Sequence, residues 1–139
     1  MHKLLIDVNV PLDVILARDP HAAASENILV YLENKKAKGY LSAASFPILY
    51  YLIRKSFGHQ KTMEHMKTLL KFLHVVEINK SILEISLYVK ISDFEDGIQV
   101  ACAQHCGADF IITRDLESYK HSSFPFMTPA KYLATYSSE

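Results

Sequence analysis

The sequence lacks several features that define whole classes of protein. It has no tryptophan, 4 glycines and 5 prolines among 139 residues, and a formal net charge of zero. So little glycine and proline excludes collagen-like and low-complexity chains. A content of 50% hydrophobic residues without net charge excludes intrinsic disorder. The length suits one folded domain over residues 1–139, and any basic surface for nucleic acid must be local.

Long apolar runs are also missing. No run of about 18 apolar residues occurs, so we expect no membrane span. The first apolar run, Leu4-Leu5-Ile6, ends at Asp7 and is too short for the core of a secretion signal. We therefore expect a cytoplasmic protein that does not associate with membranes.

Cysteine is scarce, with Cys102 and Cys106 four positions apart in a predicted helix. That spacing is poor for a disulfide. His105 would add a third zinc ligand, but no second ligand pair stands at the usual spacing. The sequence favours two free thiols.

Short apolar runs alternate with helical patterns along the chain. This alternation is typical of a parallel sheet covered on both faces. The predicted fold is therefore a three-layer α/β fold with a central, mostly parallel sheet flanked by helices. The expected strands are 4–6, 40–43, 75–78, 110–112 and, weakly, 126–127. The expected helices are 11–18, 22–36, 45–57 with Ser45 as N-cap, 59–73 after a break at Gly58, 81–90 and 93–106.

Acidic residues follow two of these strands directly. Asp7 follows the first strand, and Thr113-Arg114-Asp115 follows the strand 110–112. Ligands of parallel α/β sheets bind at the carboxyl ends of the strands. Asp96, in the first turn of the preceding helix, can reach the same edge. We therefore expect Asp7, Asp96 and Asp115 to converge there.

Converging carboxylates repel one another and need a cation to neutralise them. A site made only of oxygen ligands suits Mg²⁺ or Mn²⁺. Taken one by one, the same acids also have structural explanations. Asp93 and Asp96 can cap a helix, and Asp7 or Asp115 can begin a turn.

Several segments are specific as a set, although each alone is common. They are LIDVNV at 5–10, LSAAS at 41–45, YYLIRK at 50–55, DFEDGIQ at 93–99, IITRD at 111–115 and MTPAKYL at 127–133. In this order they resemble a PIN domain, the nuclease fold of VapBC-type toxins and of RNA-processing enzymes. The resemblance covers nearly the whole chain. It implies a PIN-like fold and a metal-dependent endoribonuclease.

The resemblance also implies roles for individual residues. Asp7, Asp96 and Asp115 match the catalytic, metal-binding acids, with Mg²⁺ or Mn²⁺ as the cofactor. Thr113 matches a hydroxyl that supports the metal, and Asn9 matches a polar residue near the first acid. RNA is the implied substrate. The implied protein partners are a small antitoxin, as in the toxin members, and a second copy of the chain in a homodimer.

One position departs from the family pattern. Many PIN domains carry a glutamate near the start of the helix after the second strand, and Ile48 stands there in this chain. The cluster therefore loses one ligand, for which Asp93 or Glu95 would have to compensate. This departure keeps a second function open, a catalytically weakened PIN module that binds RNA or a protein without cleavage.

Basic and aromatic residues suggest how RNA would be held. Arg54, Lys55 and Arg114 are predicted to contact phosphates. Tyr50, Tyr51 and Tyr119 are candidates to stack on single-stranded bases, although tyrosines at helical spacing more often belong to the core or to an interface. The alternatives are a solvated helix end for Arg54 and Lys55, and a surface ion pair for Arg114.

Two other α/β classes also place an aspartate after the first strand. A phosphatase of the haloacid dehalogenase type needs a second aspartate two residues later, where this chain has Asn9. A receiver domain needs an acidic pair before its phosphoacceptor, and that pair is absent from the sequence. Both classes are therefore less favoured than the PIN domain.

Overall fold

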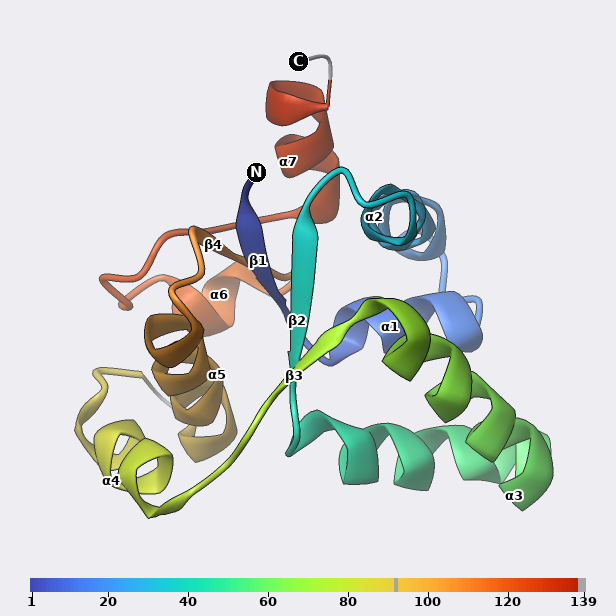
Figure 1. Cartoon of the computed structure of the whole chain (residues 1–139), viewed down its shortest axis with the longest axis horizontal. Helices are drawn as coiled ribbons and strands as arrows, with labels where there is room; N and C mark the ends of the chain where they lie inside the picture. The colour runs from blue at the N-terminus through green and yellow to red at the C-terminus, as the bar shows by residue number, and fades with distance from the viewer. Residues whose placement is uncertain (92, 138–139) are drawn as a thin grey trace.

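A computed structural model describes residues 1–91 and 93–137. In this part of the chain a five-stranded sheet lies between two groups of helices (Figure 1). Every strand pair is parallel, and the spatial order is β3-β2-β1-β4-β5. The predicted three-layer α/β fold is thereby confirmed. The strands are β1 (Lys3–Ile6), β2 (Lys38–Ser42), β3 (His74–Val76), β4 (Phe110–Ile112) and β5 (Phe126–Met127).

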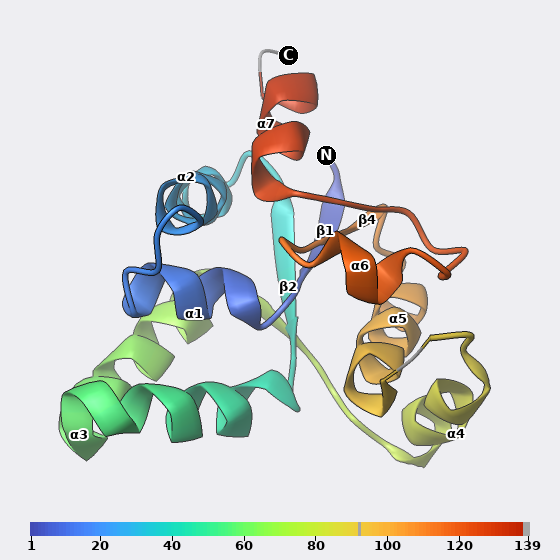
Figure 2. The same cartoon turned by 180° about the vertical axis from the view of Figure 1, so that it is seen from behind.

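The helices divide into two layers, one on each side of the sheet (Figures 1 and 2). One hydrophobic core joins the sheet to the first layer and a second core joins it to the other. The first layer holds α1 (Asn9–Ile15), α2 (Ala22–Glu33), α3 (Ser45–Phe72) and α7 (Pro129–Tyr136). The second holds α4 (Lys80–Tyr88), α5 (Phe94–Cys106) and α6 (Leu116–Tyr119).

Strand β1 is buried on both faces, which explains its unbroken apolar sequence. Leu4 and Ile6 belong to the first core, whereas Leu5 between them belongs to the second. Successive side chains of a strand point to opposite faces, so both cores draw on this one strand. The result is a central strand whose carboxyl end is fixed from both sides.

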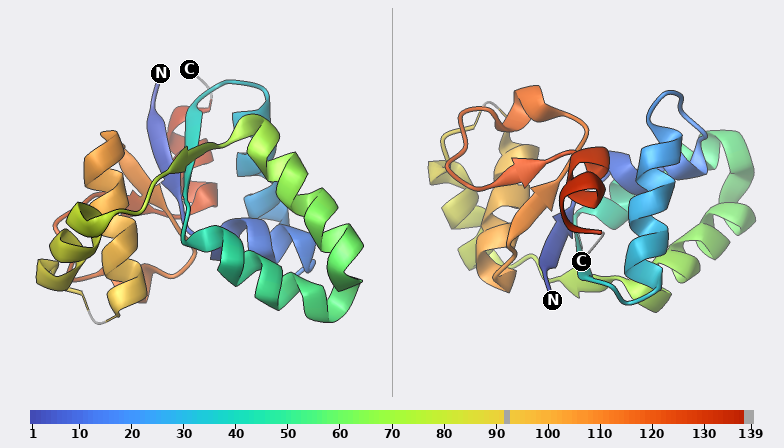
Figure 3. Two further views of the ribbon diagram at one scale, coloured as in Figure 1. Left: turned by 60° about the horizontal axis from the view of Figure 1, so that its bottom comes forward. Right: turned by 90° about the horizontal axis from the view of Figure 1, so that it is seen from above.

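Helix α3 consists of two helical segments joined by a bend, so the predicted break at Gly58 is confirmed. The bend lies at Gly58, with φ 75° and ψ 174°, a conformation that favours glycine (Figure 3). The hydroxyl of Thr62 donates to the Gly58 carbonyl at 2.6 Å. The predicted cap at Ser45 is wrong, because Ala44 is the N-cap and no side chain caps this helix.

The last two helices have clear starting residues that the sequence prediction did not use. Asp115 caps the single turn of α6 by accepting the Ser118 N–H. Thr128 caps α7, and Pro129 lies in its first turn. Other element ends differ from the predicted ones by a few residues; α2, for example, ends at Glu33.

Cys102 is buried and Cys106 is half-buried, and both are free thiols. No helix in residues 1–91 and 93–137 is both long enough and apolar enough to cross a membrane.

Candidate metal centre at the carboxyl edge of the sheet

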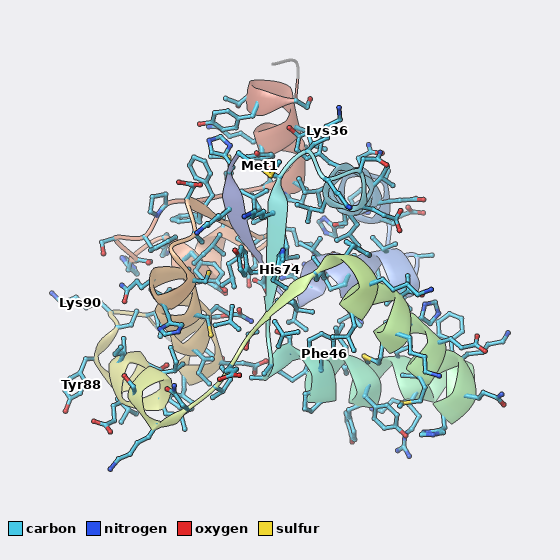
Figure 4. The ribbon with its side chains drawn as sticks, in the orientation of Figure 1. Met1, Lys36, Phe46, His74, Tyr88 and Lys90 are labelled. Carbon is cyan, nitrogen blue, oxygen red and sulfur yellow. The ribbon has the colours of Figure 1, made fainter. Side chains whose placement is uncertain are left out.

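The chain changes direction across the sheet at β1. It runs outward through β2 and β3 on one side of β1, and through β4 and β5 on the other. Such a switch point opens a crevice between the loops that leave the two adjacent strands. The loops after β1 and β4 meet there, because the Asp7 N–H donates to the Ile112 carbonyl at 2.9 Å. In Figure 4, Phe46 marks this carboxyl end of the sheet, and Met1 and Lys36 mark the opposite end.

Asp7 is only 4% exposed and receives only neutral donors. Its Oδ2 accepts from the Thr113 hydroxyl at 2.8 Å and from the Tyr119 hydroxyl at 3.3 Å, and its Oδ1 accepts from the Asn9 N–H at 3.4 Å. Burial raises the pKa of Asp7, and the charge of Asp115 adds to that rise while the hydrogen bonds oppose it. Asp7 is therefore a buried acid whose charge is incompletely compensated.

Asp96 lies in the first turn of α5. That helix begins at Asp93, whose carboxylate accepts the Glu95 N–H at 2.8 Å, so the predicted capping by Asp93 is confirmed. The Oδ1 of Asp96 lies 3.4 Å from the Tyr119 hydroxyl oxygen. Burial, followed by the negative charge of Asp7 and of the other nearby acids, raises the pKa of Asp96 to about 6. The carboxylates that act on Asp96 thus form one electrostatic cluster.

Asp115 is tied into its own loop more tightly than the other two acids. Its Oδ1 accepts the Ser118 N–H at 3.2 Å, and its Oδ2 accepts the Ser118 hydroxyl at 2.5 Å. The Asp115 N–H donates to the hydroxyl oxygen of Thr113 at 3.0 Å. Thr113 therefore links Asp115 to Asp7, and Asp115 adds negative charge to the cluster.

Tyr119 has a role that the sequence did not indicate. It is wholly buried, which confirms the favoured core position and excludes the alternative that it stacks on an RNA base. Its hydroxyl lies between the carboxylates of Asp7 and Asp96, within 3.3 and 3.4 Å of an oxygen of each. One available signal is spacing, because Tyr119 follows Asp115 by one helical turn.

Arg114 joins the loop after β4 to α1 through Asp13. Its Nε donates to Asp13 Oδ2, and its Nη2 donates to Asp13 Oδ1 at 3.4 Å. The Arg18 guanidinium lies 3.8 Å from the same carboxylate. Asp13 is completely buried, and the sequence analysis missed it. The signal was an acid inside the apolar stretch VPLDVIL.

Arg54 and Lys55 lie on the exposed surface of α3. The Arg54 guanidinium lies 5.9 Å from the Tyr50 ring centre, and the Lys55 ammonium lies 4.9 Å from that of Tyr51. Neither cation forms an ion pair with an acid in the described part of the chain. Their predicted contact with RNA phosphates stays a prediction.

Two neutral amide side chains, Asn9 and Gln99, lie on segments that also carry acids of the cluster. Ile48 lies half-buried in the first turn of α3. Gln99, 3% exposed, donates from Nε2 to the hydroxyl of buried Ser45 at 3.3 Å. The side-chain oxygens of Gln99 and Asn9 are buried and have no hydrogen-bond partner among the described residues.

The donor set of this edge fits a hydrated hard cation. In residues 1–91 and 93–137, no three His, Cys, Asp or Glu side chains are grouped closely enough to bind one ion directly. Mg²⁺ keeps several waters and needs only one or two carboxylates from the protein. Asp7 and Asp96 meet at one hydroxyl, and the two unpaired amide oxygens require donors. Oxygen acceptors without histidine or thiolate do not favour zinc.

The fold and this edge define the chain as a parallel α/β protein with a carboxylate site at its switch point. The family model of the PIN domain matches residues 3–117. The chain belongs to the PIN domain family, and the resemblance inferred from the sequence is confirmed.

Solved structures of toxin–antitoxin proteins share the fold. VapBC2 from Rickettsia felis, bound to a promoter DNA fragment, matches with a TM-score of 0.71 and 15% identity over 91% of this chain and 98% of that chain. A Klebsiella pneumoniae toxin–antitoxin complex matches with a TM-score of 0.69 and 20% identity over 91% and 97%. The Mycobacterium tuberculosis toxin VapC20, which cleaves the sarcin–ricin loop, matches with a TM-score of 0.62 and 12% identity over 78% and 86%. Comparison with curated proteins gives no significant match.

Proposed function

We propose that the chain is a metal-dependent endoribonuclease that hydrolyses RNA phosphodiester bonds at Asp7, Asp96 and Asp115. One observation carries this proposal: the carboxylates of Asp7 and Asp96 both lie within hydrogen-bond distance of the Tyr119 hydroxyl. Among the described residues, neither acid forms an ion pair with a cation. Neighbouring acids whose pKa values are raised by burial and by one another are typical of functional sites. Membership of the PIN domain family supports the proposal, because its members are nucleases.

Mg²⁺ or Mn²⁺ bound here would neutralise phosphate charge and activate a water for hydrolysis. Asp7 and Asp96 are the acids placed to hold it, and Asp115 adds negative charge. Thr113 fixes the orientation of the Asp7 carboxylate, and the Asn9 N–H holds its second oxygen. Asp93 supports the site by capping the helix that carries Asp96.

RNA binding would rely on cations around this edge. Arg54 and Lys55 are exposed on α3 and are the first candidates for phosphate contacts. Arg114 is already engaged by Asp13, so its contact with RNA would use guanidinium donors left over from that pair. Single-stranded or looped RNA suits the exposed Tyr51 ring.

We further propose that the chain acts as the toxin of a toxin–antitoxin pair in the cytoplasm, as a homodimer bound by a small antitoxin. The similar structures from Rickettsia felis and Klebsiella pneumoniae are toxin–antitoxin complexes, which supports an antitoxin partner. A catalytically weakened module that binds RNA or a protein without cleavage is the second candidate. Ile48 at the usual glutamate position favours it.

The test is cleavage of a structured RNA by the purified chain in EDTA, Mg²⁺ or Mn²⁺. We expect cleavage only with metal, and a loss of at least about 100-fold in Asp7→Asn and Asp96→Asn. Glu64→Gln, which changes an exposed acid of α3, is the matched control and should cleave normally. Unchanged cleavage by Asp7→Asn would indicate a contaminant and remove the assigned site. RNA binding without cleavage would favour the weakened module.

A further inference from the structure

Two buried side-chain oxygens of the described residues have no hydrogen-bond partner, and each belongs to a segment that also carries an acid of the cluster. One is Oδ1 of Asn9, two residues after Asp7. The other is Oε1 of Gln99, whose side chain is 3% exposed and therefore shielded from solvent. A buried acceptor without a donor destabilises the folded state. Two such oxygens on segments of the same cluster therefore indicate that a donor is missing there.

Gln99 connects α5, which carries Asp96, to α3, which has Ile48 where many PIN domains have a glutamate. It follows Asp96 by three positions on α5, so both side chains lie on the same face of that helix. Its Nε2 donates to the hydroxyl of Ser45 on α3 at 3.3 Å, and Ile48 follows Ser45 by three positions. Both helices begin at the same edge of the sheet (Figures 1 and 3).

The chemistry of the missing donor follows from its neighbours. Asp7 and Asp96 are acceptors whose pKa values are raised by burial and by mutual repulsion, and the amide oxygens of Asn9 and Gln99 are acceptors too. A hydrated divalent cation would supply positive charge to the two acids and hydrogen-bond donors, from its waters, to the two amide oxygens. Amide oxygens bind hard cations or their waters, although without the charge of a carboxylate.

We propose that Gln99 Oε1, together with Asn9 Oδ1, completes the shell of a divalent ion at Asp7 and Asp96 and so takes over part of the role of the glutamate replaced by Ile48. This inference rests on the proposed function, because it requires a metal at this edge. Gln99 acts on the ion or on its waters, and the Ser45 hydroxyl fixes the direction of its amide.

Mn²⁺ binding to the full chain without RNA tests this role independently of cleavage. Titration is followed by electron paramagnetic resonance and calorimetry at about pH 8. We expect Q99A to weaken Mn²⁺ binding about 10-fold, as substitutions around a metal commonly do. Q99E should instead tighten binding, because it places a carboxylate where the amide oxygen lies. Q104E, which adds the same charge at an exposed position of α5, is the matched control and should leave the affinity unchanged.

A rescue variant links Gln99 to the missing glutamate. I48E should tighten Mn²⁺ binding in the wild-type background and restore it in the Q99A background. S45A leaves Oε1 in place but removes its anchor, so we expect a smaller loss of affinity than in Q99A. Circular dichroism and urea unfolding of each variant check that the fold is retained.

The outcomes separate this inference from the proposed function. If Asp7→Asn abolishes Mn²⁺ binding while Q99A and Q99E bind as the wild type does, the metal site stands and the role of Gln99 is overturned. If Q99E weakens binding as much as Q99A, the amide only packs against Ser45 and the inference fails. If the wild type binds no Mn²⁺, the proposed metal centre falls and the inference falls with it. Should Q99A not fold, the nearly isosteric Q99E decides.

Discussion

Two buried aspartates, Asp7 after β1 and Asp13 in α1, differ in how their negative charge is compensated. Asp13 is fully buried and lies against the guanidinium groups of Arg114 and Arg18. Asp7 is 4% exposed and receives only hydroxyl and N–H donors. A buried carboxylate costs several kcal/mol unless a cation compensates its charge. Asp13 therefore belongs to a structural ion pair. The negative charge of Asp7 has no such partner, and a bound metal would compensate it.

The loop after β4 contacts both aspartates, each through a different residue. Thr113 and Arg114 are adjacent, yet Thr113 donates to Asp7 and Arg114 donates to Asp13. One residue thus orients the acid cluster, while the next fixes the loop to α1. The structural ion pair and the acid cluster can consequently be changed separately by substitution.

Breaking the structural pair should give the largest loss of stability. Asp13→Asn keeps the size of the side chain but removes its charge, leaving Arg114 without its counter-ion. We expect a loss of about 3 kcal/mol in the free energy of unfolding, measured by urea denaturation. Asp19→Asn, at an exposed position, is the control and should change stability by less than about 0.5 kcal/mol. Equal stability of the Asp13→Asn and wild-type proteins would contradict the contrast with Asp7.

The same substitution at Asp7 should act in the opposite direction. Burial raises the pKa of Asp7, so the folded protein gains by replacing its carboxylate with a neutral amide. We expect Asp7→Asn to raise the free energy of unfolding at neutral pH in EDTA, measured by urea denaturation. A loss comparable with that of Asp13→Asn would mean that the hydrogen bonds to Asp7 outweigh its uncompensated charge.

One half of this contrast, the acid cluster at the strand ends, lay within reach of the sequence, whereas the buried pair of Asp13 did not. The acids at strand ends were predictable, because parallel strands place their carboxyl ends at one edge and apolar runs locate the strands. The unbroken apolar run of β1 predicted a strand, and the structure buries that strand on both faces. The family motifs added the fold and the order of the acids.

The partners of these acids could not be predicted in the same way. Tyr119 meets Asp7 across 112 positions of sequence, and Arg114 meets Asp13 across 101. Such contacts depend on the direction in which a loop leaves its strand, and no local pattern sets that direction. The capping role of Asp115 was visible from its spacing to Ser118, but the rotation of α6 that brings Tyr119 to Asp7 was not.

The pH dependence of stability should sharpen the contrast further. The pKa of Asp96 is raised from 3.8 to about 6, so between these values the folded state binds more protons than the unfolded state. Stability in EDTA should therefore fall as pH rises through this window, by on the order of 1 kcal/mol because Asp96 is partly exposed to solvent. Asp96→Asn should flatten this part of the profile, whereas Glu64→Gln should not. A wild-type profile that rises over the same window would show that Asp96 is stabilised as a carboxylate.

The smallest expected effect comes from the second cation beside Asp13. Arg18 is exposed and lies 3.8 Å from the carboxylate, whereas Arg114 is half-buried and donates to both of its oxygens. An exposed pair at this distance is screened by salt and is worth about 0.5 kcal/mol or less, so Arg18→Ala should cost no more than that in urea denaturation. Arg114→Ala should cost several times as much, and added salt should reduce only the Arg18 effect. Equal losses of unfolding free energy in Arg18→Ala and Arg114→Ala would show that the two cations neutralise Asp13 jointly. The charge of Asp13 would then not depend mainly on the loop after β4, which also carries Thr113.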